Sequence, residues 1–199
     1  MKLTVLGRYG KFPNKDGATC SYLIQSSGGT RIVLDMGSGS LHNLNKILDY
    51  KDIDGVIISH FHGDHCADAF VFRNIALELT KTDVWKTKLP FFMPQHPIDE
   101  YNALKSCPGF EVVDIHNELK SRIKDLELEF IRVNHPLPTF GVRVIDSEKK
   151  VLSYTADIMD KKNLDKLFKG SDFALVDACI LQKNHKEGAP HISVKNIAR

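Results

Sequence analysis

The sequence predicts a mixed α/β fold of the α+β type, in which two similar halves each form a sheet covered by helices. The predicted elements follow the order β-rich, αβα, β-rich, αβ, which is typical of layered sandwiches. The chain has 199 residues, of which 42% are hydrophobic and 26% charged. These proportions exclude collagen-like, disulfide-scaffold and wholly disordered classes. We expect one domain over residues 1–199, with halves at about 1–118 and 119–199.

The first third of the chain is predicted to form short strands separated by glycines. Three segments alternate in polarity or are rich in β-branched residues, namely 2–6, 19–25 and 30–35. Gly28 and Gly29 predict a hairpin between the last two of these segments. Ser40 is a candidate N-cap of a helix whose apolar residues recur at helical spacing. The apolar run 55–59 then predicts a strand that is buried on both faces.

The rest of the chain alternates between helices and a second β-rich stretch. A helix with a broad apolar face is predicted over 64–80. A strand at 89–93 and a helix after Pro97 follow it. Periodicity then predicts strands at 126–133, 140–145 and 151–156, a helix over 161–168, a strand over 173–180, and a last helix capped by Ser193.

Charge and cysteine content narrow the function classes. Lys and Arg number 27 against 25 Asp and Glu, and a net charge of +2 gives no electrostatic argument for a nucleic-acid or membrane partner. The four cysteines contain no CxxC pair, and no basic-then-apolar signal segment opens the chain. No apolar run approaches the ~20 residues of a membrane span. We therefore expect a cytoplasmic protein with free thiols and no membrane association.

A cluster of metal-ligand residues directly follows the buried strand. His60, His62, Asp64 and His65 fall within six positions, an HxHxDH pattern whose chance occurrence is on the order of 10⁻³. Imidazole and carboxylate ligands suit Zn²⁺, and the lack of a nearby thiolate pair argues against a structural cysteine site. His60 and His62 can point the same way from extended backbone. Gly63 would permit a turn that brings Asp64 and His65 toward a second ion.

The alternative interpretation of this cluster is a solvated loop with coincidental histidines. Three crowded imidazoles would repel one another once protonated, and nothing else in the sequence explains them. Two further residues, His135 and Asp157, end predicted strands in the same way. Each alone would be an ordinary surface or turn residue, but after HxHxDH we predict that both are metal ligands. Arg143 and Tyr154 are more easily structural than catalytic.

Six segments share motifs with one known family, namely TVLGRYGKFP, LDMGSG, VIISHFHGDH, NHPLPTFGVRV, VLSYTAD and HISVKNIA. Together they resemble the metallo-β-lactamase superfamily, and within it the ribonuclease Z and phosphodiesterase branch. The resemblance implies a four-layer αββα sandwich with the metals at one edge between the sheets. It also implies that His60, His62 and His135 hold one zinc and that Asp64 and His65 hold the other, with Asp157 bridging both.

The chemistry implied is hydrolysis by a metal-bound hydroxide. A zinc ion lowers the pKa of its bound water by about nine units, on the order of 12 kcal/mol. Two ions ~3.5–4 Å apart can clamp the attacking and leaving oxygens of an in-line displacement at phosphorus. Asp64 can orient the hydroxide and accept its proton. His191 matches the family's histidine that acts near the leaving group. The alternatives for His191 are a surface residue or the last ligand of the second zinc.

Two departures from the family pattern modify this expectation. Ribonuclease Z proteins carry a long arm between the positions of His135 and Asp157, but only 21 residues separate them here. Because the arm is absent and the net charge is small, RNA is not the favoured substrate. A small-molecule or nucleotide phosphodiester is favoured instead. The family also continues past HISVKNIA to a last histidine ligand, and no histidine follows His191. We therefore expect an incomplete second half, a weak second zinc site and a C-terminally shortened chain.

The leading hypothesis is a zinc-dependent phosphodiesterase. Fold and metal site alone do not determine the substrate, so an acyl hydrolase acting on a thioester or lactone is the alternative enzyme. A degenerate member that binds metal without catalysis is the other alternative. A homodimer is a further expectation, because an incomplete second half would leave sheet edges to be covered.

Overall fold

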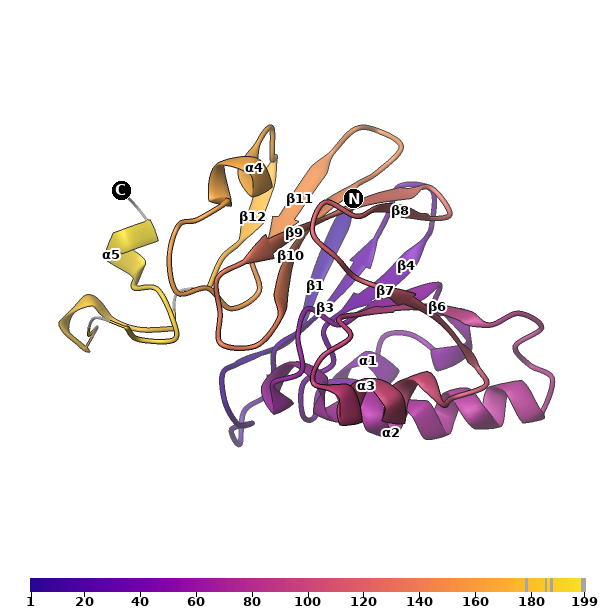
Figure 1. Ribbon diagram of the computed structural model, residues 1–199. Coiled ribbons are helices and arrows are strands. Elements are labelled where there is room, and N and C mark those ends of the chain that lie inside the picture. Colours follow the sequence, from indigo (N-terminus) through magenta and orange to yellow (C-terminus); the bar gives the residue numbers. More distant parts are fainter. Residues whose placement is uncertain (178, 185, 187, 198–199) are drawn as a thin grey trace.

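Two β-sheets face each other and helices cover their outer faces in the computed structural model, which describes residues 1–177, 179–184, 186 and 188–197 (Figure 1). This arrangement confirms the predicted αββα sandwich. Among the described residues, no helix combines the length and the apolar composition needed to cross a bilayer. The division into halves near residue 118 stays a prediction.

The first sheet has seven strands in the order β2-β1-β3-β4-β5-β6-β7. These are β1 (Lys2–Tyr9), β2 (Ala18–Thr19), β3 (Ser21–Gln25), β4 (Arg31–Leu34), β5 (Gly55–Ile57), β6 (Leu89–Met93) and β7 (Phe110–Asp114). The predicted hairpin joins β3 to β4 antiparallel, with Gly29 at φ 91°. From β4 to β7 the pairing is parallel, so the carboxyl ends of these four strands lie at one edge of the sheet.

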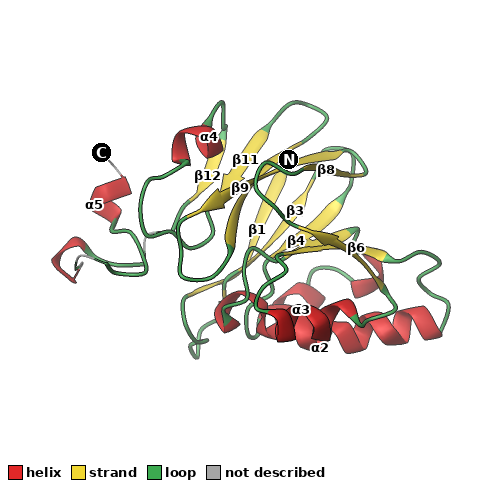
Figure 2. Cartoon of the chain, in the orientation of Figure 1, coloured by secondary structure: helices red, strands yellow, loops and turns green. Residues whose placement is uncertain are grey.

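Three helices lie on the outer face of this sheet, as Figure 2 shows in red. They are α1 (Ser40–Asn45), α2 (Gly63–Lys81) and α3 (Ile98–Lys105). A short 3₁₀ turn, η1 (Tyr50–Asp52), leads into β5. The core beneath the helices includes Phe61, Phe72 and Phe91, which are all buried. The prediction that Ser40 caps α1 is wrong: Gly39 occupies the cap position in a left-handed conformation, and Ser40 is the first helical residue.

The second sheet has five strands in the order β12-β11-β10-β9-β8. These are β8 (Lys120–Ile123), β9 (Leu126–Val133), β10 (Thr139–Ile145), β11 (Val151–Tyr154) and β12 (Phe173–Leu175). Helix α4 (Leu164–Phe168) packs on its outer face through Leu164 and Leu167. Beyond β12 lie η2 (Gln182–Asn184) and α5 (Val194–Ile197), which Ser193 caps by accepting the Asn196 N–H at 3.3 Å.

Several elements are shorter than predicted: β5 and β11 each end two residues early, and β12 and α4 differ most. Strand β12 pairs with β11 only through Phe173, Ala174 and Leu175, so the expected strand over 173–180 ends early. The residues after it turn toward the ends of β9 and β11 because Asp177 accepts the Ile158 N–H there. Helix α4 begins at Leu164 rather than 161, after Asn163 in a left-handed conformation.

An ion pair between the buried Arg143 and the half-buried Glu129 ties α4 to the second sheet. Arg143 on β10 lies opposite Glu129 on β9, and its Nε donates to Glu129 Oε2 at 2.9 Å. Its Nη1 donates to the Leu167 carbonyl at 2.7 Å, at the end of α4. Hydrogen bonds from Lys120 and Arg143 outweigh burial and lower the pKa of the Glu129 carboxyl. The charged form is therefore the one that folding favours.

We expect Glu129→Gln to lower the free energy of unfolding at pH 7 by about 1–2 kcal/mol. Because the folded pKa is depressed, the stabilisation is present above the unfolded value near 4.5 and is lost as the pH falls through the folded pKa. Urea denaturation of both proteins, with a chelator present, at pH 7 and below pH 4 measures this. An equal difference at the two pH values would contradict the assignment.

Candidate metal centre

The six predicted metal ligands meet where strands of both sheets end. His60 and His62 follow β5, and Asp64 and His65 lie in the first turn of α2. His135 follows β9, and Asp157 follows β11 on the opposing sheet. Four of the predicted ligands therefore come from one connection in the first half of the chain and two from separate turns in the second half. The sandwich brings them together because both sheets end at the same edge.

Strand-like alternation aims the first two histidines. Phe61 packs into the core under the helices, so His60 and His62 on either side of it point the other way, toward the second sheet. The turn predicted at Gly63 is absent: Gly63 begins α2, and a Cβ there would meet no atom within 4 Å. The helix itself places Asp64 and His65. Gly37 is the glycine that matters here, because a Cβ on it would collide with the Asp64 carbonyl oxygen.

Three imidazole nitrogens converge on one point. His62 Nδ1 lies 3.1 Å from His60 Nε2 and 3.1 Å from His135 Nε2. A tetrahedral zinc with bonds of about 2.0–2.1 Å separates its ligand atoms by about 3.3 Å, so this spacing fits a metal ion. Burial and the neighbouring His60 lower the pKa of His135 to about 4. Burial also lowers the pKa of His60, so both rings are neutral near pH 7 and their lone pairs are free.

Asp157 lies between this cluster and the other two ligands. Its Oδ2 is 3.6 Å from His60 Nε2 and 3.7 Å from His135 Nε2, while its Oδ1 is 3.2 Å from His65 Nε2. Burial opposes ionisation of Asp157, but the hydrogen bonds from His60 and His65, together with the charge of His65, outweigh it and hold its pKa well below the usual value. One carboxylate thus presents an oxygen to each side.

Asp64 is held by the loop after β1. The Lys11 N–H donates to Asp64 Oδ2 at 2.7 Å, with Lys11 itself in a left-handed conformation at φ 63°. That same oxygen lies 3.9 Å from His65 Nε2. The loop therefore fixes the carboxylate on the His65 side of the centre.

Asp35 is a central residue that sequence reasoning missed. It is fully buried at the end of β4, and its Oδ2 accepts His65 Nδ1–H at 2.7 Å and Ser59 Oγ–H at 2.8 Å. The Ser59 hydroxyl in turn lies 3.0 Å from His60 Nδ1. Asp35 therefore orients imidazoles on both sides of the centre, the outer-shell arrangement that metal-ligating histidines need. The sequence feature that could have identified Asp35 is its position as an acidic residue at the end of a buried strand, which Asp157 shares.

Asp177 was missed in the same way. It follows β12, and its Oδ2 lies 2.8 Å from His191 Nδ1. The Asp177 hydrogen bond is the main cause that raises the pKa of His191. His191 Nδ1 also lies 3.9 Å from Asp157 Oδ2, so Asp157, Asp177 and His191 form a third group that could hold a metal. The neighbouring Pro190 carbonyl lies 3.2 Å from His135 Nδ1 and directs Nε2 of that ring into the centre.

Comparison with known proteins decides the family. Residues 12–199 match the family described as Beta-lactamase superfamily domain. The chain belongs to the beta-lactamase superfamily. Among its relatives, Probable metallo-hydrolase YhfI of Bacillus subtilis (strain 168) is 27% identical over 179 residues, which cover 90% of this chain and 72% of the relative. Ribonuclease Z of Thermococcus sibiricus is 28% identical over 75% of this chain, but the match spans only 49% of its own length.

Solved structures of the superfamily share the fold. The crystal structure of the metallo-beta-lactamase fold protein YhfI from Bacillus subtilis superposes with a TM-score of 0.90 at 23% identity, over 99% of this chain and 79% of that one. The crystal structure of the human tRNase Z short form superposes with a TM-score of 0.74 at 18% identity, over 100% of this chain and 86% of that one. The crystal structure of a diphosphatase from the PhnP family superposes with a TM-score of 0.71 at 17% identity, over 98% of this chain and 78% of that one. These neighbours confirm the predicted metallo-β-lactamase fold.

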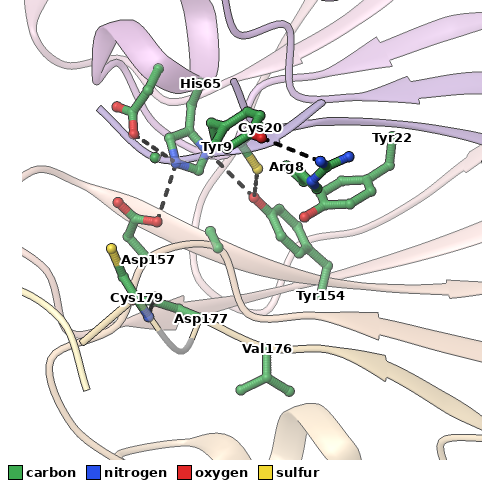
Figure 3. A pocket seen from close by; sticks show the side chains of 13 residues that line it. Arg8, Tyr9, Cys20, Tyr22, His65, Tyr154, Asp157, Val176, Asp177 and Cys179 are labelled. Atoms are coloured by element: carbon green, nitrogen blue, oxygen red, sulfur yellow. Dashed lines mark hydrogen bonds and ion pairs between the residues drawn. The ribbon is translucent and has the colours of Figure 1, made fainter. Parts of the chain in front are cut away.

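A cavity of about 290 Å³ opens beside the centre of this superfamily member (Figure 3). Asp64, His65 and Asp157 line the end that adjoins the centre. The rest of the wall is formed by Arg8, Tyr9, Gly10, Cys20, Tyr22, Tyr154, Ala156, Val176, Asp177 and Cys179. A ligand can therefore contact the candidate metal centre and a tyrosine-rich wall at once.

The ligand assignment makes a direct prediction for His62. His62→Ala removes the nitrogen that is shared by the two 3.1 Å contacts, and we expect the purified protein to lose one equivalent of zinc. Mass spectrometry of the bound metal measures it, with the exposed His42→Gln as the control. Full zinc content in His62→Ala would refute the assignment.

Proposed function

We propose that the protein is a zinc-dependent hydrolase that cleaves a small-molecule or nucleotide phosphodiester. The observation that carries the proposal is the position of Asp157 between His60 and His135 on one side and His65 on the other. Such a carboxylate can bridge two ions. When bound, the ions supply a water of lowered pKa and positive charge at the phosphoryl oxygens.

The chain's own residues supply the proton transfers. Asp64, fixed by the Lys11 N–H, has its second oxygen free to orient the attacking water and accept its proton. His191 has Nδ1 engaged by Asp177, so Nε2 is the nitrogen that can donate a proton to the leaving oxygen. The raised pKa keeps His191 in its acid form at higher pH. This supports a general-acid role over that of a last metal ligand.

The cavity wall favours a substrate that carries negative charge. Arg8 lines the cavity, and within the described part of the chain its guanidinium makes no ion pair. Its Nη2 donates to the Tyr9 hydroxyl at 3.2 Å, and its Cζ lies 5.0 Å from the centre of that ring. The guanidinium thus lies beside the cavity, and no residue in the described part of the chain pairs with its charge. It suits a phosphate better than a neutral lactone.

Precursor RNA is the less favoured phosphodiester. Strands β10 and β11 and the turns around them fill the described residues between His135 and Asp157, where the resemblance would place an RNA-gripping arm. A homodimer through an edge strand such as β12 stays part of the proposal, and size-exclusion chromatography with light scattering would measure it.

Two substrates separate the enzyme classes. We expect the zinc-loaded protein to hydrolyse bis(p-nitrophenyl) phosphate and to leave S-lactoylglutathione intact. Activity on the thioester alone would overturn the phosphodiesterase proposal in favour of an acyl hydrolase. Metal content tests the non-catalytic alternative: near two zinc ions per chain support catalysis, and near zero supports a degenerate member.

A further inference from the structure

The hydroxyl of Tyr154 completes the set of donors around Asp35. Tyr154 ends β11 on the second sheet, and its Oη donates to Asp35 Oδ2 at 2.6 Å. Asp35 follows β4 on the first sheet, so this bond crosses between the two sheets. The same oxygen accepts from His65 and Ser59, and Asp35 Oδ1 accepts the Ser59 N–H at 2.7 Å. The carboxylate is therefore held from both halves of the fold.

The direction of these bonds is determined by the chemistry of the partners. A carboxylate only accepts, so the single hydroxyl proton of Tyr154 goes to Asp35. Cys20 Sγ, which lies 3.2 Å from the same hydroxyl oxygen, must then be the donor in that contact. The chain of donors therefore runs from Cys20 through Tyr154 to Asp35. It leaves His65 with Nδ1–H engaged and Nε2 facing Asp157.

Packing alone does not require this hydroxyl. Tyr154 is 4% exposed and lies in the core between the sheets, among residues such as Leu34, Phe130 and Val142. Its ring packs edge-on against Tyr22, with centroids 5.6 Å apart. A phenylalanine would fill the same space without burying a polar group. The hydroxyl is therefore best explained by its contact with Asp35.

We infer that Tyr154 is a positioning residue for the metal site built on His65. Its hydroxyl fixes the Asp35 carboxylate, and Asp35 fixes the orientation of the His65 ring. Tyr154 also lies three residues before Asp157, so one segment of the second sheet positions both the bridging carboxylate and the imidazole opposite it. The inference rests on the metal centre of the proposed function. It adds a residue that would not bind the metal itself and would act on it through Asp35 and His65.

The test compares Tyr154→Phe with a matched control. The Tyr101 side chain on α3 is also buried, in the core beneath the helices, and its hydroxyl also donates to an aspartate, Asp114, at 2.6 Å. Tyr101→Phe therefore removes a tyrosine–aspartate hydrogen bond of the same length that is partly buried and lies away from the centre. Zinc affinities of the chelator-stripped proteins are measured by competition with a chromophoric chelator, and His65→Ala identifies which zinc equivalent depends on His65.

We expect Tyr154→Phe to weaken that equivalent by about 10–100-fold, the usual effect of losing an outer-shell partner. The other equivalent should keep its affinity, and Tyr101→Phe should change neither. Circular dichroism checks that both variants fold. Unchanged affinity in Tyr154→Phe, or an equal change in Tyr101→Phe, would overturn the inference.

A second measurement keeps the inference testable if the metal centre of the proposed function fails. Wild-type protein that binds fewer than two zinc ions would count against the proposed two-metal phosphodiesterase, not against Tyr154. The His65 Nδ1–H proton of the metal-free protein can then be followed by NMR, assigned by its loss in His65→Ala. We expect it to exchange with solvent at least about tenfold faster in Tyr154→Phe, because its acceptor is less constrained. Equal exchange rates would refute the positioning role.

Discussion

Replacing Asp157 by asparagine is expected to reduce bound zinc from near two ions to at most one per chain. We expect kcat/KM for a phosphodiester to fall by about 10³-fold or more, on the order of 4 kcal/mol of transition-state stabilisation. The reason is geometric: Asp157 presents one oxygen to His60 and His135 and the other to His65. An amide keeps the shape but offers one neutral acceptor and a donor that faces the remaining ligands.

Metal content by mass spectrometry and initial rates with bis(p-nitrophenyl) phosphate check this prediction. Asp165→Asn, on the exposed face of α4, removes one carboxylate from the same half of the chain and should leave both quantities unchanged. Two zinc ions retained in Asp157→Asn would rule out the bridging role, even if activity fell.

His191→Gln is expected to lower kcat by about 10²–10⁴-fold on a phosphodiester with an alkoxide leaving group. The effect should be much smaller with a p-nitrophenolate leaving group, because that anion departs without a proton. Zinc content should stay at the wild-type value. Loss of zinc in His191→Gln would instead assign His191 as the last ligand of the second ion.

The pH profile gives an independent check on His191. Asp177 raises the pKa of His191, so the acid form persists above the ordinary value of 6.5, and kcat should decline as the pH rises through the raised pKa. Asp177→Asn removes that hydrogen bond and should move the alkaline limb to lower pH. A limb that stays in place would show that another group controls it.

Local sequence was enough to identify the first four ligand candidates. His60, His62, Asp64 and His65 are adjacent in the chain, and a short buried strand followed by a helix presents them with little help from distant residues. The layers of the fold were likewise predicted, since hydrophobic periodicity is a local property. The error at Ser40 arose because a left-handed Gly39 can begin a helix without a side-chain cap.

The residues around the predicted ligands could not be predicted, because their partners are distant in the sequence. Asp35 contacts His65 thirty positions away and Tyr154 119 positions away. Asp177 contacts His191, which lies fourteen positions further along the chain. Each of these residues ends a strand in an ordinary sequence context. Only the packing of one sheet on the other defines their partners.

The sequence by itself determined two sheets covered by helices and a cluster of histidines and aspartates after a buried strand, because strand periodicity and ligand spacing are properties of neighbouring residues. The packing of the sheets into a sandwich with the metals at one edge was predicted from the family resemblance. The resemblance also predicted that the two halves share one centre, and the tertiary structure decided which residues surround it. Asp157 and His135 cross to the ligands after β5, and Tyr154 crosses to Asp35, because both sheets end at the same edge. The reason is physical: a carboxylate or imidazole buried there requires partners, and the opposing sheet is the nearest source of them.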